Sequence, residues 1–435
     1  MKKFICAGFI IGIFLLCKIP AQAQFLMDMI DTTKELGKST FQTIDRFNHI
    51  RISGYIQPQY QIASEKGAKG YSGGNFEPNS DNRFMIRRGR LRFDYMRTDE
   101  LHRNQIQFVF QFDGTERGVF IRDFWGRYWE NKWQLLAFTG GMFARPFGFE
   151  VNLSSSDRES PERGRMSQIL MKTERDLGFM TTLEKRGQSS GFKFFRMDLG
   201  VFNGQGLTAS GEYDSFKDII GQFVLKPQKL TEKLTLGAGA SFLYGGLEQT
   251  SKYSYRLSEG KGDNIFIKDS VTSTVGSKLP RQYYGLNAQL RYKTKWGNTE
   301  LRAEYWQGTQ TGTQISSETP TSIIGAAPMY VRPFQGGFLY FLQHIVNVRN
   351  QIGLKFDWYD PNTAIAGEYI GSPGTNFSDA DIKYSTLGCG YIRYINENMK
   401  LVLWYEWVKN ESTSLSGFTT DKSDNVFTAR VQFRF

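Results

Sequence analysis

The stretch F-T-A-R-V-Q-F-R-F, Phe427–Phe435, ends the chain and decides the fold. Aromatic or aliphatic residues occupy its odd positions, and Thr, Arg or Gln occupies its even positions. Because successive side chains on a strand point to opposite faces, this pattern predicts a strand with one apolar and one basic, hydrated face. On its own, such a strand would also fit the half-buried edge of a soluble sandwich.

The same alternation recurs along the chain and favours a membrane barrel. Period-two segments lie at 105–113, 286–293, 301–306, 351–358 and 400–407, separated by loops rich in Gly, Ser, Asn and charge. Their polar faces repeatedly carry charges, which the interior of a sandwich would not tolerate. Aromatic residues such as Trp296 and Trp358 gather at strand ends, as at the two interfaces of a membrane.

Composition and length agree with this fold. Aromatic residues make up 15% of the chain, and it holds 45 glycines but only 12 prolines. We find no run of 18 or more apolar residues after the N-terminal leader. At about 10 residues per strand plus loops, the chain from His49 onward allows roughly 16 to 18 strands, enough to enclose a water-filled channel. The predicted fold is an all-β, transmembrane, antiparallel β-barrel of about 16 strands.

The first residues predict export. Two lysines precede an apolar run from Phe4 to Leu16, and Ala21-Gln22-Ala23 forms a cleavage site, so residues 1–23 read as a signal peptide cut after Ala23. Its removal takes away three lysines and no acid, which lowers the formal net charge from +11 to +8. Cys389 is then the only cysteine, so no intramolecular disulfide is expected.

Residues 24–48 differ from the rest of the chain. Apolar residues, among them Leu26, Ile30, Phe41 and Ile44, recur at spacings of three and four, as on one face of a helix. A short periplasmic helix, a helical oligomerisation segment and a loosely ordered leader all remain open. We therefore divide the chain into signal peptide 1–23, periplasmic segment 24–48 and barrel 49–435.

The densest basic motif is Asn82–Tyr95, N-R-F-M-I-R-R-G-R-L-R-F-D-Y. On a strand, Arg88, Arg90 and Arg92 share one face and would point into the lumen. Their mutual repulsion is unfavourable unless an anion or water offsets it, and the guanidinium fork suits phosphate and carboxylate oxygens. The alternative is that these arginines brace the pore wall by pairing with acids, namely Asp94, Asp113, Asp123 and Glu304.

The stretch from Arg145 to Arg175 is long enough to fold into a barrel and narrow it. Its candidate constriction residues are Arg145, Arg158, Arg163 and Arg165. The charges of this stretch nearly balance, so a hydrated surface loop is an equal alternative.

Several short motifs carry a family resemblance. They are R-R-G-R-L-R-F at Arg87–Phe93, Ile121-Arg122-Asp123, A-R-P-F-G-F-E at Ala144–Glu150, R-D-L-G at Arg175–Gly178, G-V-F-N-G-Q-G at Gly200–Gly206, A-E-Y at Ala303–Tyr305 and the terminal Phe435. The chain resembles the phosphate-selective porin O and P family, in its Bacteroidetes-type form. The resemblance implies a sixteen-stranded barrel, usually trimeric, whose arginine-lined pore passes anions by diffusion.

By this resemblance the phosphate-coordinating pair falls on Arg87 and Arg88, and the nearby pore acid on Asp123. Strand alternation, however, places Arg87 on the lipid face unless the strand bulges at Gly89 or begins after it. The first strand, Gly54–Tyr60, also lacks the basic residue common in the family. A general anion or small-solute pore therefore remains open.

Other classes of function find little support. The three histidines, His49, His102 and His344, have no spacing typical of a metal site, so we expect no metal, no cofactor and no enzyme activity. Export and strand-by-strand alternation argue against binding of nucleic acid.

We expect a bacterial outer-membrane porin that passes anions such as phosphate or pyrophosphate. Its pore-lining arginines would be Arg87, Arg88, Arg90 and Arg92, with Arg122, Arg291, Arg302 and Arg430, and Asp123 and Glu304 would orient the guanidinium groups. The expected partners are outer-membrane lipid, inorganic anions, two further copies in a homotrimer, and the barrel-assembly machinery through the Phe435 strand. The alternatives are a general porin without phosphate selectivity and a non-conducting, ligand-binding or structural barrel.

Overall fold

The computed structural model describes residues 49–186, 193–207, 211–257, 266–270, 274–320, 322, 325 and 327–435. The predicted signal peptide and the segment 24–48 lie outside these residues. Among the described residues, every helix is too short or too polar to span a bilayer.

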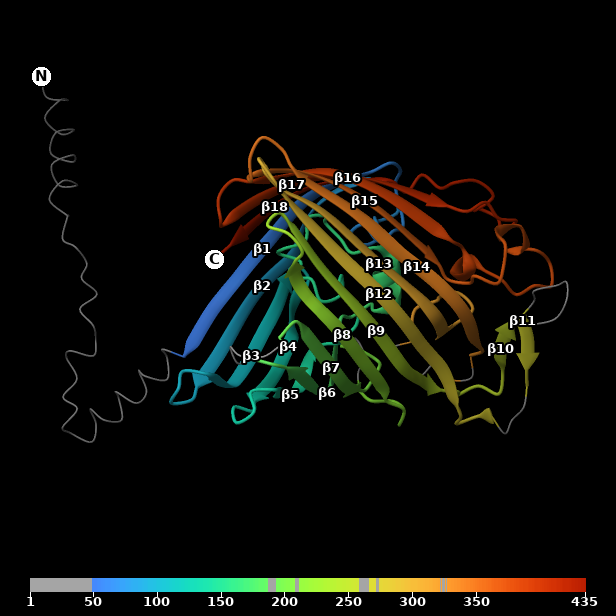
Figure 1. Ribbon diagram of the computed structural model, residues 1–435. Coiled ribbons are helices and arrows are strands. Elements are labelled where there is room, and N and C mark those ends of the chain that lie inside the picture. The colour runs from blue at the N-terminus through green and yellow to red at the C-terminus, as the bar shows by residue number, and fades with distance from the viewer. Residues whose placement is uncertain are drawn as a thin grey trace, which may run out of the picture. The chain divides into compact units, whose positions relative to one another are not determined.

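One closed sheet dominates the described chain (Figure 1). The barrel strands are β1 (Ile50–Ala63), β2 (Asn82–Thr98), β3 (Asn104–Thr115), β4 (Gly118–Trp129), β5 (Leu136–Ala144), β6 (Arg175–Glu184), β7 (Phe195–Phe202), β8 (Asp218–Lys229), β9 (Leu234–Glu248), β12 (Lys278–Thr294), β13 (Gly297–Gly312), β14 (Met329–His344), β15 (Asn350–Asp360), β16 (Tyr384–Tyr394), β17 (Met399–Asn410) and β18 (Val426–Arg434). Each pairs antiparallel with its neighbours, and β18 pairs with β1 to close the barrel.

Two further strands form a hairpin outside the barrel, β10 (Ser254–Leu257) and β11 (Phe266–Asp269). Strand β9 pairs directly with β12, so the hairpin is an excursion of the loop between them. Of the eighteen strands in the described residues, sixteen therefore build the barrel, which confirms the predicted fold class and its strand number.

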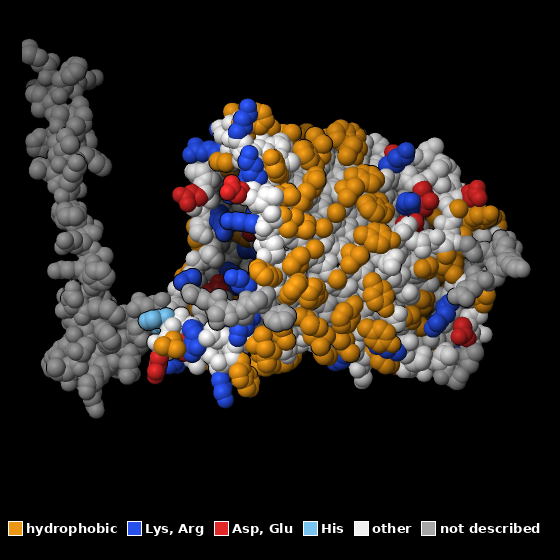
Figure 2. Space-filling model, viewed as in Figure 1, with side chains coloured by type: hydrophobic (Ala, Val, Ile, Leu, Met, Phe, Trp, Pro, Cys, Tyr) orange, Lys and Arg blue, Asp and Glu red, His pale blue; other side chains and the backbone are white. Residues whose placement is uncertain are grey.

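The alternation along the last strand has the predicted cause. On β18, Thr428, Arg430 and Gln432 are nearly fully buried against the interior, whereas Phe433 is 46% exposed on the outside. The main chains of Phe435 and Gly54 exchange two hydrogen bonds, which fastens the last residue to the first strand. Figure 2 shows hydrophobic side chains spread over the visible outer wall and charged side chains gathered toward its two ends. This is the surface of a transmembrane barrel.

The two ends of the barrel differ. At one end the connections are short, for example 99–103, 230–233 and 295–296; at the other they are long, for example 64–81, 145–174 and 361–383, apart from the tight turn at 116–117. In transmembrane barrels the short turns face the periplasm and the long loops face outward.

Candidate functional site

The constriction loop, residues 145–174, joins β5 to β6 and lies inside the barrel. It contains the short helix α3 (Arg165–Leu170), and most of its side chains are buried. Its apolar residues form one core with the inner faces of β12–β15: Phe147 packs edge-on against Trp306, with ring centroids 4.7 Å apart, and Met166 and Met171 join the same cluster. Because it is packed as tightly as a protein core, this loop is a fixed part of the pore wall.

Glu304 on β13 fixes the start of the loop. Its carboxylate accepts hydrogen bonds from the backbone N–H groups of Phe149, at 2.9 Å, and Glu150, at 2.8 Å, and from the Trp306 indole at 2.7 Å. The expectation that Glu304 orients guanidinium groups is wrong, because all of these donors are backbone or indole N–H groups. Its role is to satisfy buried backbone donors of the loop.

Glu150 ties the loop to β15. Its carboxylate lies 2.6 Å from the Lys355 ammonium and also accepts from the Ser167 hydroxyl and the Gly164 N–H. Burial raises the pKa of Glu150, but the positive charges of Lys355 and Arg158 outweigh burial and leave that pKa below its ordinary value. The carboxylate is therefore ionised and holds the loop.

A second set of bonds ties the middle of the loop to the wall. Arg302 on β13 makes a bidentate ion pair with Glu159, at 2.8 and 3.0 Å. Lys400 on β17 donates to the carbonyl groups of Ser156 and Arg158. Arg302 thus acts as an anchor of the loop, since both of its outer nitrogens are engaged by Glu159.

Glu162 gathers three arginines from three directions. Its carboxylate is 2.8 Å from Arg87 Nε, 2.7 Å from Arg88 Nη2 and 2.8 Å from Arg430 Nη2. Burial raises the pKa of Glu162, yet these three guanidinium groups hold it well below its usual range. A loop carboxylate therefore occupies the place where the sequence suggested a phosphate.

Arg87 reaches this cluster although strand alternation placed it on the lipid face. Pairing between β2 and β3 begins only at Gly89 and Gly114, so Arg87 lies on the part of β2 that extends beyond the end of β3. There its long side chain is free to turn inward to Glu162. The inward position agrees with the placing of Arg87 among the pore-lining arginines, and the start of pairing at Gly89 is one of the two conditions that strand alternation required for it.

Glu174, at the end of the loop, gathers a second set of arginines. It pairs with Arg122, with Arg163 at 3.4 Å and with Arg175 at 3.8 Å. Burial raises the pKa of Glu174, but its arginine neighbours lower it well below the ordinary value. Asp123 in turn pairs with Arg175 at 3.1 Å.

A β-bulge on β4 brings Arg122 and Asp123 to the same face. Gln111 of β3 pairs with Asp123 and the next residue, Phe112, pairs with Ile121, so Arg122 is an extra residue in the strand. Ile121 and Phe124 on either side are about half exposed on the outer wall. Both polar residues therefore face the lumen, as a bulge allows.

The remaining predicted arginines fall into three groups. Arg90 pairs with Asp113 at 3.2 Å and Arg92 with Asp94 at 2.6 Å, the bracing arrangement that the sequence left open.

The loop arginines bind within the protein: Arg145 to the Thr173 carbonyl, Arg158 to the Leu153 carbonyl, Arg163 to the Ser167 and Met171 carbonyls, and Arg165 against two tyrosine rings. Arg291 is 53% exposed beside Glu300 and lines none of the cavities described below.

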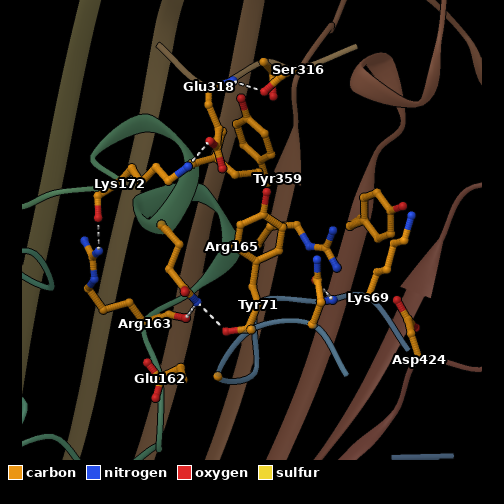
Figure 3. Close-up of a pocket in the computed structure, with 18 of the residues that line it drawn as sticks. Lys69, Tyr71, Glu162, Arg163, Arg165, Lys172, Ser316, Glu318, Tyr359 and Asp424 are labelled. Atoms are coloured by element: carbon orange, nitrogen blue, oxygen red, sulfur yellow. Dashed lines mark hydrogen bonds and ion pairs between the residues drawn. The ribbon is translucent and has the colours of Figure 1, made fainter. Parts of the chain in front are cut away.

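Cavities follow one another through the lumen. The vestibule, a cavity of about 960 Å³ among the long loops, reaches down to Arg122 and Glu174 (Figure 3). Beyond that pair, a cavity of about 320 Å³ is lined by Arg90, Arg92, Arg122 and Arg175 and reaches Gly54 and Arg434 at the short-turn end. A third, of about 210 Å³, shares Arg92 and Arg175 with the second. The Arg122–Glu174 ion pair lines both the vestibule and the second cavity.

Sequence reasoning missed several members of the site. None of Glu159, Glu162, Glu174, Arg175, Lys355 and Lys400 was among the predicted site residues. The alternation of Lys400 and Lys355 with apolar neighbours gave a signal that they face inward. Nothing in the sequence indicated which loop acid meets which arginine, since these contacts join residues up to 277 positions apart.

Comparison with known proteins supports the fold. No protein-family model matches the sequence, and no curated protein shows a significant sequence match. The structure is similar to OprB of Pseudomonas putida, with a TM-score of 0.57 at 11% identity, covering 93% of this chain and 98% of that one. It is also similar to the outer membrane channel DcaP of Acinetobacter baumannii, with a TM-score of 0.53 at 12% identity, covering 89% and 97%. The chain therefore has the barrel fold seen in these outer-membrane proteins.

Proposed function

We propose that the protein is an outer-membrane porin, a passive diffusion channel that prefers anions. The observation that supports this proposal is the arginine lining of the cavities on both sides of the Arg122–Glu174 ion pair. Arg122 joins the vestibule to the inner cavity, and Arg90, Arg92 and Arg175 line the space beyond it. A water-filled passage lined by fixed positive charge concentrates anions and repels cations.

The apolar outer surface of the barrel supports its placement in a lipid bilayer. Exposed apolar side chains such as Leu199, Leu286 and Leu339 cover strands on different sides of the barrel. The C-terminal strand, with Phe435 68% exposed, is the segment that we propose the barrel-assembly machinery recognises.

The height of the wall supports a trimer. Strands β5, β6 and β7 have 9, 10 and 8 residues, whereas β12, β13 and β14 have 17, 16 and 16. At about 3.3 Å per residue and a tilt of about 40°, eight residues rise roughly 20 Å, less than the apolar band of about 25 Å. We propose that this low wall faces other copies of the chain in a homotrimer.

The proposal extends to phosphate as a solute that binds in the lumen. Arg87 and Arg88, with Arg430, form a cluster able to bind an oxyanion, but Glu162 already neutralises part of it. We therefore propose weak binding of phosphate or pyrophosphate, by competition with Glu162. Weak binding suits conduction, because a solute must leave the site as readily as it enters.

The test is single-channel recording of the refolded protein in a planar bilayer under a salt gradient. We expect open steps with an anion-favouring reversal potential and block by added phosphate. Arg122→Ala should lower the anion-to-cation permeability ratio by about fivefold, the effect of ~1 kcal/mol for one charge near the path in water. Arg291→Ala is the matched control, since Arg291 lies away from the cavities. Indifferent or cation-favouring steps would refute anion preference and leave a general porin.

A blocked barrel is the second candidate, favoured by the Arg122–Glu174 ion pair, whose two residues line both the vestibule and the second cavity. If verified, folded protein gives no steps at any voltage, the barrel is a binding or structural protein rather than a channel.

A further inference from the structure

The vestibule contains two buried charged side chains whose polar atoms lack partners. Arg165 of α3 is 8% exposed and Asp424, in the loop between β17 and β18, is 7% exposed. Both line the vestibule, yet Arg165 Nε and Asp424 Oδ1 have no hydrogen-bond partner among the described residues. Leaving a buried charged donor or acceptor unsatisfied costs about 1–3 kcal/mol or more, so each atom favours an added partner.

The surroundings of Arg165 leave one edge of its guanidinium group for a ligand. The guanidinium carbon lies 3.6 Å from the ring centroid of Tyr384 and 4.8 Å from that of Tyr71. Figure 3 shows the side chain extending past Tyr71 toward the side of the vestibule where Lys69 and Asp424 lie. Both rings pack near the guanidinium group and Nε is left without a partner, so the group retains a donor for a carboxylate, the anion whose oxygens match a guanidinium fork.

Asp424 supplies the opposite chemistry. Its carboxylate forms no ion pair with any described residue, and its free oxygen can accept from an ammonium or hydroxyl group. Tyr71, Tyr359, Tyr384 and Phe418 give the same cavity an aromatic lining. With about 960 Å³, the vestibule has far more room than one inorganic anion needs.

We propose that the vestibule binds a small zwitterion, an amino acid or short peptide with an aromatic or apolar side chain. Its carboxylate lies along the edge of Arg165, its ammonium group meets Asp424, and its side chain packs among the tyrosine rings. This proposal deepens the proposed porin function by naming a class of solute collected at the mouth of the pore. The binding itself does not depend on conduction.

The test is to measure ligand binding to the folded protein in detergent micelles by saturation-transfer NMR. L-Phenylalanine carries both charges, whereas 3-phenylpropionate lacks the ammonium and phenethylamine lacks the carboxylate. We expect L-phenylalanine to bind about tenfold more tightly than either analogue, since each lost charged contact is worth about 1.5 kcal/mol or more. Equal binding of all three, or no binding, would overturn the proposal.

Two variants assign the contacts. Arg165→Gln should weaken L-phenylalanine and 3-phenylpropionate by about tenfold and leave phenethylamine unchanged. Asp424→Asn should bring L-phenylalanine down to the affinity of 3-phenylpropionate without changing the latter, a pattern that misfolding would not produce. Arg117→Gln, in the exposed turn after β3 and outside the vestibule, is the control for loss of one arginine. If the protein conducts no ions but shows this pattern, the porin proposal fails and the binding site stands.

Discussion

Arg88 Nη2 lies 2.7 Å from Oε2 of Glu162, so an arginine of the predicted anion site is already bound to a carboxylate of the protein's own loop. The same carboxylate holds Arg87 and Arg430. The Glu162 carboxylate therefore offsets part of the positive charge of this cluster. Each variant that alters a loop carboxylate tests how much of that positive charge remains available to a solute.

Removing the charge of Glu162 should strengthen the response to anions. In Glu162→Gln the three arginines lose their counter-charge, so we expect phosphate to block at concentrations about tenfold lower, as an ionic contact of ~1.4 kcal/mol becomes available. Phosphate titration of single-channel current measures this change. Glu232→Gln removes an equal charge from the exposed 230–233 turn, outside the three cavities, and should leave block unchanged. Identical block in both variants would contradict a role for Glu162 as a competing anion.

The loop should respond to acid only at low pH. The folded-state pKa values of Glu162 and Glu174 lie well below the ordinary value of 4.5. A carboxyl group with a depressed pKa contributes stability that is present above the unfolded pKa and is lost as pH falls through the folded pKa. Protonation of Glu162 and Glu174, and the change in conductance that it causes, should therefore occur only well below pH 4. A change centred between pH 5 and 6 would show that other groups hold the loop.

Arg302→Ala should release the middle of the loop. The substitution leaves Glu159 buried without its bidentate partner, which costs about 3–5 kcal/mol when one member of a buried pair is removed. We expect trypsin to cut at loop residues such as Arg158 and Arg163 in the variant and not in the parent, with fragments assigned by mass spectrometry. Arg291→Ala, on the adjacent strand, should remain resistant.

Phe435→Ala should reduce assembly more than stability. The main-chain bonds between residue 435 and Gly54 survive the substitution, so the folded barrel should lose little. Because we propose that the assembly machinery reads this residue, the heat-modifiable band in the outer-membrane fraction should fall several-fold. Phe120→Ala, an aromatic on β4 that is 60% exposed against 68% for Phe435, serves as the control. Equal yields of the two variants would refute a role for Phe435 in recognition.

The barrel was predictable because alternation is a local property of a strand. Thr428, Arg430 and Gln432 face inward on β18 as their positions require. The bulge that turns Arg122 inward depends on the register of β4 against β3, which neighbouring residues along β4 do not encode. Alternation alone could not place Arg87 in the lumen for a similar reason, since the end of β3 decides where the pairing of β2 begins.

The constriction loop was only half predictable. Its length indicated a loop able to enter the lumen, but its balanced charges also fitted a hydrated surface. What decides between them is the wall opposite: Glu304, Lys355 and Lys400 each offer a partner to the loop across the barrel. Such pairings are properties of the closed barrel as a whole, and no single strand shows them.

The bonding of Glu162 to three arginines means that the passage carries a tethered competitor. Because the carboxylate is attached to the wall, its effective concentration at the arginine cluster is fixed, in the way that linking two partners fixes it at millimolar levels or above. A dilute, singly charged anion would rarely displace the Glu162 carboxylate. An anion with several charges, or one present at high concentration, would displace it. In the channel that we propose, the loop would thereby set a threshold on which solutes pass.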